Sequence, residues 1–311
     1  MPALVPARAG GYLGRMLRFP RAALGVALAA TLAAVLGMLA GAAQAEPPVW
    51  VVHGAHSTVV LFGSVHILPP DLKWEPAKLK RAVKHAHEFW FEIPLDDASM
   101  AAASLAAETQ GLQPVGQTLS AELNQADRAR LVKLAQTYAA PMEELDRLKP
   151  WLAEIRLSVA SYRDLGASRD LGVEHQILTG ARADARQRAF ETPQEQIGYL
   201  ASASEPDQVA SLEETFDELD AGPASFQRLI KAWMTGDLAA LNAEALQPLA
   251  KASPAIYRTM VVQRNQHWLA AILERLDQPG DAVMVVGVGH LIGPDGLPAL
   301  LRAKGIRVDG P

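Results

Sequence analysis

Short apolar segments near both ends of the chain are separated by polar turns, and each predicts a strand. Residues 49–53 and 58–62 are apolar runs on either side of the turn Gly54-Ala55-His56-Ser57, so the two runs are expected to form a hairpin. Residues 282–286 form a continuous apolar run that is typical of a strand buried on both faces. A last short strand is expected at residues 306–308.

A third strand is indicated over residues 88–93, where Phe89, Phe91 and Ile93 alternate with Glu88, Trp90 and Glu92. Glu92 therefore lies at the carboxyl end of this strand. Helices are expected near residues 76–87, before the strand, and near residues 296–304, close to the end of the chain.

Most of the chain from about residue 97 to residue 276 has helical periodicity, which predicts a large helical insertion. Helix starts are indicated at Ser120 and at Thr192-Pro193, because Ser and Thr favour the N-cap and Pro the first helical position. A short strand over residues 187–191 interrupts the helices. No low-complexity linker or short-period repeat is found, so one α/β domain is expected over residues 46–311.

The first 45 residues have the charge order of a secretory signal. They contain Arg8, Arg15, Arg18 and Arg21 and no acidic residue, and an apolar stretch then closes on Ala43-Gln44-Ala45. We therefore predict a signal peptide over residues 1–45 and an exported protein, periplasmic or extracellular. An uncleaved membrane anchor is the alternative, since about 20 apolar residues can span a bilayer.

Composition removes several classes of function. Without residues 1–45 the chain has 25 basic and 34 acidic side chains, a formal charge of −9, which argues against a nucleic-acid partner. The absence of cysteine excludes disulfides, thiolate metal sites and a cysteine nucleophile. There is no H-E-x-x-H segment, and no G-x-S-x-G, P-loop or G-x-G-x-x-G motif follows a strand in the required context.

One motif occurs twice: an apolar strand followed by Gly-x-x-His and a proline-containing bend. The two copies are Gly63-Ser64-Val65-His66 and Gly287-Val288-Gly289-His290. Either copy alone favours a structural role, because a lone histidine is usually only hydrogen-bonded or exposed. If the two strands are neighbours, both histidines project into one pocket at the carboxyl ends of the strands, and Glu92 can join them. Two imidazoles and a carboxylate are suitable ligands for a divalent metal, although Glu92 could also be an ordinary solvated carboxylate.

The order and spacing of these motifs resemble the TraB/GumN family, which is related to the Tiki metalloproteases. The resemblance covers essentially all of residues 46–311. It is carried by the segments Leu61–Asp71, Phe91-Glu92, Leu148–Trp151, Leu171–Glu174, Phe190–Gln196, Gln263–Asn265 and Val286–Leu297. Ser64 stands where threonine is usual. Glu174-His175 replaces a segment that more often carries aspartate and arginine, so no role is assigned to Glu174.

The resemblance implies a fold like that of the erythromycin-esterase and ChaN group, with a central mixed sheet flanked by helices. It also implies a divalent-metal site, with manganese or cobalt favoured and zinc or iron as alternatives. His66, Glu92 and His290 are expected to be the metal ligands, and Glu191 the general base. Arg264 and Asn265 are expected to support substrate or oxyanion binding, although a helix-surface salt bridge is an equal alternative for Arg264.

The expected function is that of an exported metal-dependent hydrolase acting on a peptide or protein, in contact with the membrane only through the signal segment. Two alternatives remain open at this point. One is a metal-independent esterase or amidase that uses a histidine as general base. The other is a regulatory protein that binds haem, iron or a peptide in the same pocket. The oligomeric state is not indicated by the sequence.

Overall fold

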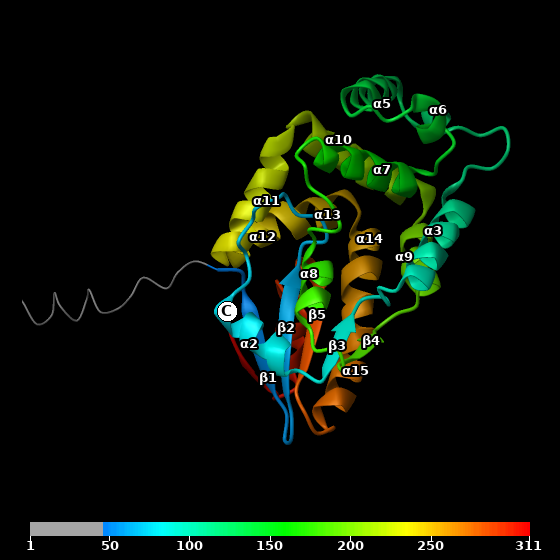
Figure 1. Cartoon of the computed structure of the whole chain (residues 1–311). Helices are drawn as coiled ribbons and strands as arrows, with labels where there is room; N and C mark the ends of the chain where they lie inside the picture. The colour runs from blue at the N-terminus through cyan, green and yellow to red at the C-terminus, as the bar shows by residue number, and fades with distance from the viewer. Residues whose placement is uncertain (1–45) are drawn as a thin grey trace, which may run out of the picture. The chain divides into compact units, whose positions relative to one another are not determined.

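The two ends of the chain meet in one mixed β-sheet. A computed structural model describes residues 46–311, and in this part of the chain the sheet has the strand order β4-β3-β5-β2-β1-β6 (Figure 1). The strands are β1 (Val49–His53), β2 (Thr58–Ser64), β3 (Glu88–Phe91), β4 (Arg186–Ala189), β5 (Ala282–Gly287) and β6 (Arg307–Asp309). β4, β3, β5 and β2 are parallel to one another, whereas β1 is antiparallel to both β2 and β6. The expected mixed α/β sheet is confirmed.

The strands predicted from periodicity are close to the observed ones. The hairpin of β1 and β2 is confirmed, and β5 extends one residue beyond the expected apolar run, to Gly287. β3 ends at Phe91, two residues earlier than expected, so Glu92 follows the strand directly. The predictions for β4 and β6 were each displaced by one or two residues, because these short edge strands are mostly exposed and lack a buried face that would mark their bounds.

The central pair of parallel strands determines the position of both Gly-x-x-His segments. β2 pairs with β5 so that Ser64 lies opposite Gly287, and β3 pairs with β5 on its other side. Parallel neighbours end at the same edge of a sheet, so the chain leaves β2, β3 and β5 on one side of the molecule. The requirement that the two motif-bearing strands be neighbours is therefore met.

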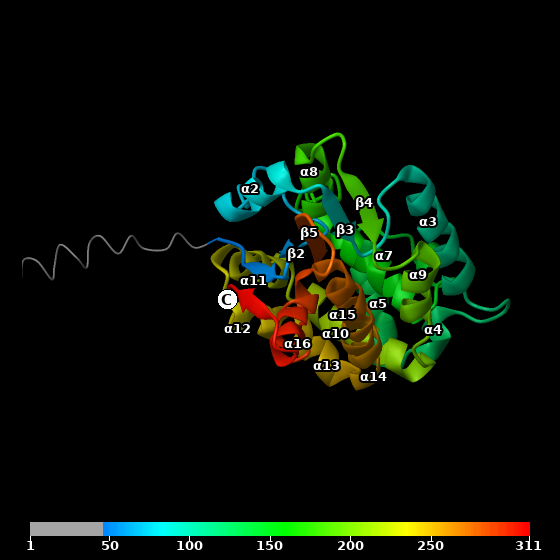
Figure 2. The ribbon, with the colours of Figure 1, turned by 90° about the horizontal axis from the view of Figure 1, so that it is seen from below.

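Helices cover both faces of the sheet (Figure 2). Figure 2 shows α2 and α8 on one face, with α15 and α16 on the other. Their bounds are α2 (Ala77–His85), α8 (Val173–Gly180), α15 (Arg264–Leu276) and α16 (Leu297–Ala303). The core between these layers is built on the apolar runs of the strands and on three tryptophans, Trp50, Trp233 and Trp268. We call it the sheet core.

The helical insertion has a second core of its own. It contains fifteen buried apolar side chains from residues 119–219, such as Leu119, Leu157 and Phe216. We call it the insertion core. The remaining helices are α3 (Asp97–Gly111), α4 (Leu119–Glu122), α5 (Gln125–Thr137), α6 (Met142–Leu145), α7 (Pro150–Arg163), α9 (Pro193–Ala201), α10 (Glu205–Asp220), α11 (Pro223–Thr235), α12 (Leu238–Leu241), α13 (Gln247–Ala252) and α14 (Pro254–Tyr257). Two π-helical turns, η1 (Asn242–Leu246) and η2 (Arg258–Gln263), and the 3₁₀ turn η3 (Val288–His290) complete the described chain.

Two predicted helix starts had different outcomes. Thr192 caps α9 as expected, because its side chain accepts from the Glu195 amide while the Glu195 carboxylate accepts from the Thr192 amide. The start predicted at Ser120 was wrong: α4 begins at Leu119, with Thr118 at the N-cap. The Ser120 amide instead donates to the Asp146 carboxylate, a partner 26 residues away, so tertiary contacts decide this boundary.

The signal segment predicted over residues 1–45 lies outside the described residues. From residue 46 to the end of the chain, no helix combines the length and the apolar character that crossing a bilayer requires.

Candidate active site

The two Gly-x-x-His segments leave the sheet side by side and converge on Gly287. A Cβ placed on Gly287 would lie 3.2 Å from Glu92 Oε1, 3.5 Å from His66 Nε2 and 3.8 Å from His290 Cδ2. Three of the residues expected in the site therefore surround one glycine. Gly63 is more tightly constrained, since a Cβ there would lie 2.9 Å from the Val288 backbone. Gly63 thus permits a backbone approach that a side chain would block, and a Cβ on Gly287 would crowd the Glu92 carboxylate.

His290 is buried and is held in a single orientation. Its Nδ1 lies 2.7 Å from Asn265 Oδ1, while the Asn265 amide group donates to the backbone oxygens of His290 and Asp295. Asn265 Oδ1 can only accept, so His290 Nδ1 carries the hydrogen and Nε2 keeps its lone pair. Burial, together with the charge of Arg264, lowers the pKa of His290 to about 3. The imidazole is therefore neutral at pH 7.

His66 lies at the exposed side of the same group. Its Nδ1 is 2.6 Å from Glu174 Oε1, and its Nε2 faces Gly287. The negative charge of Glu174 raises the pKa of His66 to about 9. The pKa of Glu174 is lowered, because the charge of His66 and the hydrogen bonds that the carboxylate accepts together outweigh the effect of burial. The pair is thus a salt bridge at neutral pH.

Gly172, at the N-cap of α8, allows this ion pair to form. A Cβ at this position would lie 2.1 Å from the backbone oxygen of His66, closer than any real contact. The absence of a side chain lets the first turn of α8 lie directly against the segment after β2, which brings Glu174 to His66.

Arg264 occupies the centre of the buried part of the site. Its five N–H hydrogens are matched by five acceptors. Nε and Nη2 donate to the two oxygens of Glu191 at 2.8 and 2.9 Å, and Nη2 also donates to Glu92 Oε2 at 2.7 Å. Nη1 donates to the Met260 backbone oxygen at 3.3 Å and to His290 Nε2 at 3.1 Å. The guanidinium therefore has no hydrogen left for another ligand in this arrangement.

Glu92 links the Gly287 amide to this guanidinium and lies beside His290. Its Oε1 accepts from the Gly287 amide at 2.7 Å and lies 3.9 Å from His290 Nε2. Its Oε2 accepts from Arg264 and from the Gln196 side chain. Burial opposes ionisation of Glu92, but the charge of Arg264, together with the smaller effects of both histidines and the Gly287 hydrogen bond, outweighs it, and the pKa lies well below its usual range. Glu92 is therefore an anion at all physiological pH values.

Glu191 is deeper than Glu92 and has no free oxygen lone pair directed at solvent. Its side chain is 1% exposed, and Oε1 accepts from Trp268 Nε1 at 2.8 Å as well as from Arg264. Burial raises the pKa of Glu191, although Arg264 opposes that shift. Trp268 also lies 4.6 Å below the guanidinium carbon and 4.4 Å from the His290 ring. We call His66, Glu92, Glu191, Arg264 and His290 the strand-end cluster.

The backbone before Arg264 is irregular in a way that directs its side chain. The π-helical turn η2 ends at Gln263, and its Met260 carbonyl accepts from the guanidinium. A π-helical turn inserts a residue into the helical repeat and so changes the face on which the following residues lie. Arg264 and Asn265 are both buried as a result, and both contact His290.

The six site residues expected from the sequence lie together: five are joined by hydrogen bonds, His66 lies beside them at Gly287, and three further residues hold members of the group. Glu174 holds His66, Trp268 holds Glu191, and Gln196 holds Glu92. The sequence predicts no role for Glu174, because its segment departs from the usual family residues. Its position in Leu171-Gly172-Val173-Glu174, two residues after a glycine, is the available signal. Trp268 and Gln196 carry no signal that separates them from core and surface residues.

Comparison with known proteins identifies the family to which the chain belongs. The family model described as TraB/PrgY/gumN matches residues 48–310. Two curated relatives, each named "Uncharacterized protein YbaP", come from Escherichia coli (strain K12) and Shigella flexneri. Each is 23% identical over 244 residues, which cover 78% of this chain and 87% of the relative. The chain belongs to the TraB/PrgY/gumN family.

Proposed function

We propose that this protein is a divalent-metal-dependent hydrolase that cleaves peptide bonds at the carboxyl ends of β2 and β5. The observation that carries the proposal is the arrangement around Gly287. The Nε2 atom of His66 and the Oε1 atom of Glu92 face this glycine, and His290 Nε2 lies 3.9 Å from the same carboxylate oxygen. Each imidazole has its Nδ1 held by another side chain, Glu174 or Asn265, which leaves Nε2 directed into the site.

The chemistry of these side chains suits a divalent cation. Metal-bound histidines usually have their second ring nitrogen oriented by a carboxylate or carbonyl, and both histidines here have such a partner. The buried part of the cluster also has two carboxylates, Glu92 and Glu191, against the single guanidinium of Arg264, so its charge favours a further cation. His66, Glu92 and His290 are the residues that would hold it, as a His₂Glu set.

Two changes would have to accompany metal binding: Arg264 would release His290, and His66, whose pKa is about 9, would lose its proton. Among residues 46–311 no three His, Asp or Glu side chains are already assembled at metal-binding geometry, and Arg264 Nη1 donates to the His290 lone pair. Release of that one hydrogen bond frees His290 Nε2, while the bidentate contact with Glu191 keeps the guanidinium anchored. A divalent metal bound there supplies Lewis-acid polarisation of a carbonyl and lowers the pKa of a bound water.

The other residues act on this set by holding it in place. Glu174 and Asn265 orient the two imidazoles, and Arg264 holds Glu92 in its ionised form. To act as the general base expected from the sequence, Glu191 would have to use Oε2, because Oε1 already accepts from Arg264 and Trp268, and the side chain is only 1% exposed. The contacts favour a different role for Glu191, that of an anchor for Arg264. Asn265 likewise uses its amide hydrogens on backbone oxygens rather than on a substrate.

Peptide or protein substrates and export from the cytoplasm are part of the same proposal. The resemblance to Tiki-like proteases supports the substrate class, and the arginine-rich, then apolar, pattern of residues 1–45 supports export.

The test is the metal content of the purified full chain after equilibration with manganese, cobalt, zinc or iron, measured beside His66→Ala and His290→Ala. We expect near-stoichiometric metal in the wild type, its loss in both variants, and peptide hydrolysis that chelation abolishes. His56→Ala is the matched control, because His56 is exposed in the hairpin turn. Absence of metal from the wild type, or its retention in both variants, would refute the proposal.

A metal-free hydrolase is a second candidate, and the His66–Glu174 pair favours it. An exposed imidazole held by a buried carboxylate is the arrangement of a histidine that transfers protons. Because the pKa of His66 is about 9, it is protonated at neutral pH and would donate to a leaving group. Hydrolysis that survives exhaustive chelation, and that falls as pH rises through 9, would support this candidate instead.

A further inference from the structure

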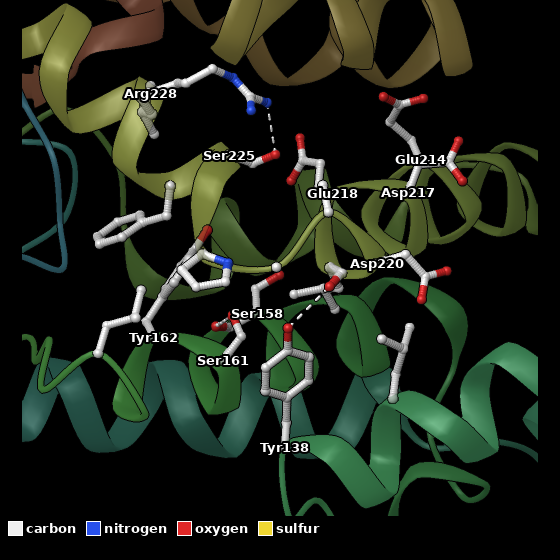
Figure 3. Close-up of a pocket in the computed structure, with 18 of the residues that line it drawn as sticks. Tyr138, Ser158, Ser161, Tyr162, Glu214, Asp217, Glu218, Asp220, Ser225 and Arg228 are labelled. Carbon is white, nitrogen blue, oxygen red and sulfur yellow. Dashed lines mark hydrogen bonds between the residues drawn. The ribbon is translucent and has the colours of Figure 1, made fainter.

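A large cavity lies away from the strand-end cluster, in the helical part of the molecule (Figure 3). Its volume is about 820 Å³, within the range of about 300–1,000 Å³ that is usual for small-molecule sites. α5, α7, α10, α11 and η1 contribute to its walls. None of the residues that form the strand-end cluster lines it.

The cavity lies where the two hydrophobic cores meet. Leu134 and Leu219 on one wall belong to the insertion core, whereas Phe226 on another belongs to the sheet core. Tyr162 lies against Phe226 with ring centroids 4.5 Å apart, and Tyr138 donates to the Leu219 carbonyl. Ligand sites occur preferentially between separately packed units, and this one has an aromatic and aliphatic wall.

The cavity lining has many more acidic than basic side chains. Six carboxylates and two basic side chains surround the space: Asp164, Glu214, Asp217, Glu218, Asp220 and Glu244, with Lys133 and Arg228. Arg228 pairs with Glu244 and Lys133 with Asp220. Within residues 46–311, Asp164, Glu214 and Glu218 form no salt bridge. The cavity therefore keeps an excess of negative charge that residues 46–311 do not neutralise.

Glu218 is the carboxylate on which this excess acts most. It projects from α10 into the space shown in Figure 3, near Glu214 and Ser225. Burial, and the charges of Glu214 and Glu244, raise the pKa of Glu218 to about 7. A positive charge in the cavity would stabilise the ionised Glu218 carboxylate and so oppose the effects of burial and of the neighbouring carboxylates.

We propose that this cavity is a binding site for an organic cation, one that carries ammonium groups on an aliphatic body. The ammonium groups would contact Glu214 and Glu218, and the body would lie against Tyr162, Phe226 and Leu229. The volume is far larger than a hydrated metal ion needs, and the aromatic lining adds cation–π attraction, which a bare ion with a complete water shell gains only weakly. The ammonium group can belong to a free polyamine or to the lysine side chain of a peptide.

The test is isothermal titration of the purified full chain with spermidine, with trilysine, and with 1,8-octanediol as an uncharged compound of similar length. We expect binding of spermidine or trilysine and no binding of the diol. The variant Glu214→Gln/Glu218→Gln should weaken the binding at least tenfold. It should also fold, because it removes like-charged neighbours and no hydrogen bond.

The matched control is Glu143→Gln/Glu274→Gln, which makes the same change in net charge at two exposed positions outside the cavity. Its affinity should stay within twofold of the wild type. Tighter binding of spermidine than of trilysine would identify a free amine as the ligand class, and the reverse order a lysine-containing peptide. No binding of either cation, or equal loss in the two double variants, would overturn the proposal.

Discussion

The strand-end cluster and the acidic cavity bury charge in opposite ways. In the cluster, every hydrogen of Arg264 meets an acceptor, and each imidazole has a partner for Nδ1. In the cavity, Glu214 and Glu218 face one another's charge without a salt bridge to residues 46–311, and the pKa of Glu218 is raised as a result. The cluster thus holds its geometry through internal bonds, whereas the cavity leaves unfavourable charge that a bound cation would relieve.

The largest effect should come from removing the guanidinium of the cluster. Arg264→Met leaves two buried carboxylates, Glu92 and Glu191, without their partner, and we expect it to cost about 3–5 kcal/mol in the free energy of unfolding. Arg228→Met, in the cavity wall, breaks an exposed pair with Glu244 and should cost less than about 1 kcal/mol. Urea denaturation measures both. Equal costs would contradict the contrast between the two regions.

The second-largest change in the free energy of unfolding is expected at Gly172, the glycine that lets Glu174 reach His66. A Cβ at position 172 would lie 2.1 Å from the His66 oxygen, so Gly172→Ala must displace the start of α8 and should cost about 2 kcal/mol. Gly198→Ala is the control, because Gly198 lies in α9 with no atom within 4 Å of an added Cβ. That substitution should raise stability by up to about 1 kcal/mol. Loss of stability in both variants would show that crowding is not the cause.

A smaller gain in the free energy of unfolding, which depends on pH, is expected when Glu218 in the cavity wall is replaced by glutamine. The folded-state pKa of Glu218 is about 7, above its ordinary value of 4.5, so the ionised carboxylate destabilises the fold. This penalty is absent below pH 4.5, grows between pH 4.5 and 7, and is complete above pH 7. Glu218→Gln should therefore add about 1 kcal/mol at pH 8 and nothing at pH 4, after allowance for the partial exposure of the group.

Glu195→Gln is the control for that measurement, because it should change the stability at pH 8 in the opposite direction. The pKa of Glu195 is lowered by the hydrogen bonds it accepts from Thr192, so its ionised form stabilises the fold above the ordinary pKa. The substitution should lower the melting temperature at pH 8 and have little effect at pH 4. If both glutamine variants lower the melting temperature at pH 8, the pKa assignment of Glu218 is wrong.

The smallest expected change in stability is at the exposed edge of the cluster, where titration is the better measurement. Glu174→Ala removes the negative charge that holds the pKa of His66 near 9, so this pKa should fall by at least one unit, while the unfolding curve at about pH 10, where the imidazole is neutral in both proteins, moves little. NMR titration of the imidazole resonances measures it. Glu143→Ala is the control and should leave His66 unchanged. A His66 pKa that stays near 9 in Glu174→Ala would exclude the salt bridge.

Periodicity was sufficient to predict the sheet and part of the site. The alternation in residues 88–93 and the apolar runs that flank the hairpin turn locate β1, β2 and β3, because burial on one or both faces of a sheet imposes those patterns. The repeated Gly-x-x-His segments pointed to His66 and His290, and the strand end to Glu92. Glu191, Arg264 and Asn265 came only from the family resemblance, since a single Glu, Arg or Asn in a helical region has no distinguishing pattern.

The sequence by itself determined which segments form strands, which segments form the helical insertion, and that two histidines follow equivalent strands. Those properties depend on near neighbours in the chain, through hydrophobic period, glycine and capping. Only the tertiary structure decided that Glu174 holds His66 from 108 residues away and that Arg264 reaches Glu92 across 172 residues. It also decided that carboxylates of several helices face one cavity. Contacts of this kind depend on how buried surfaces fit together, and the period of no single segment contains that information.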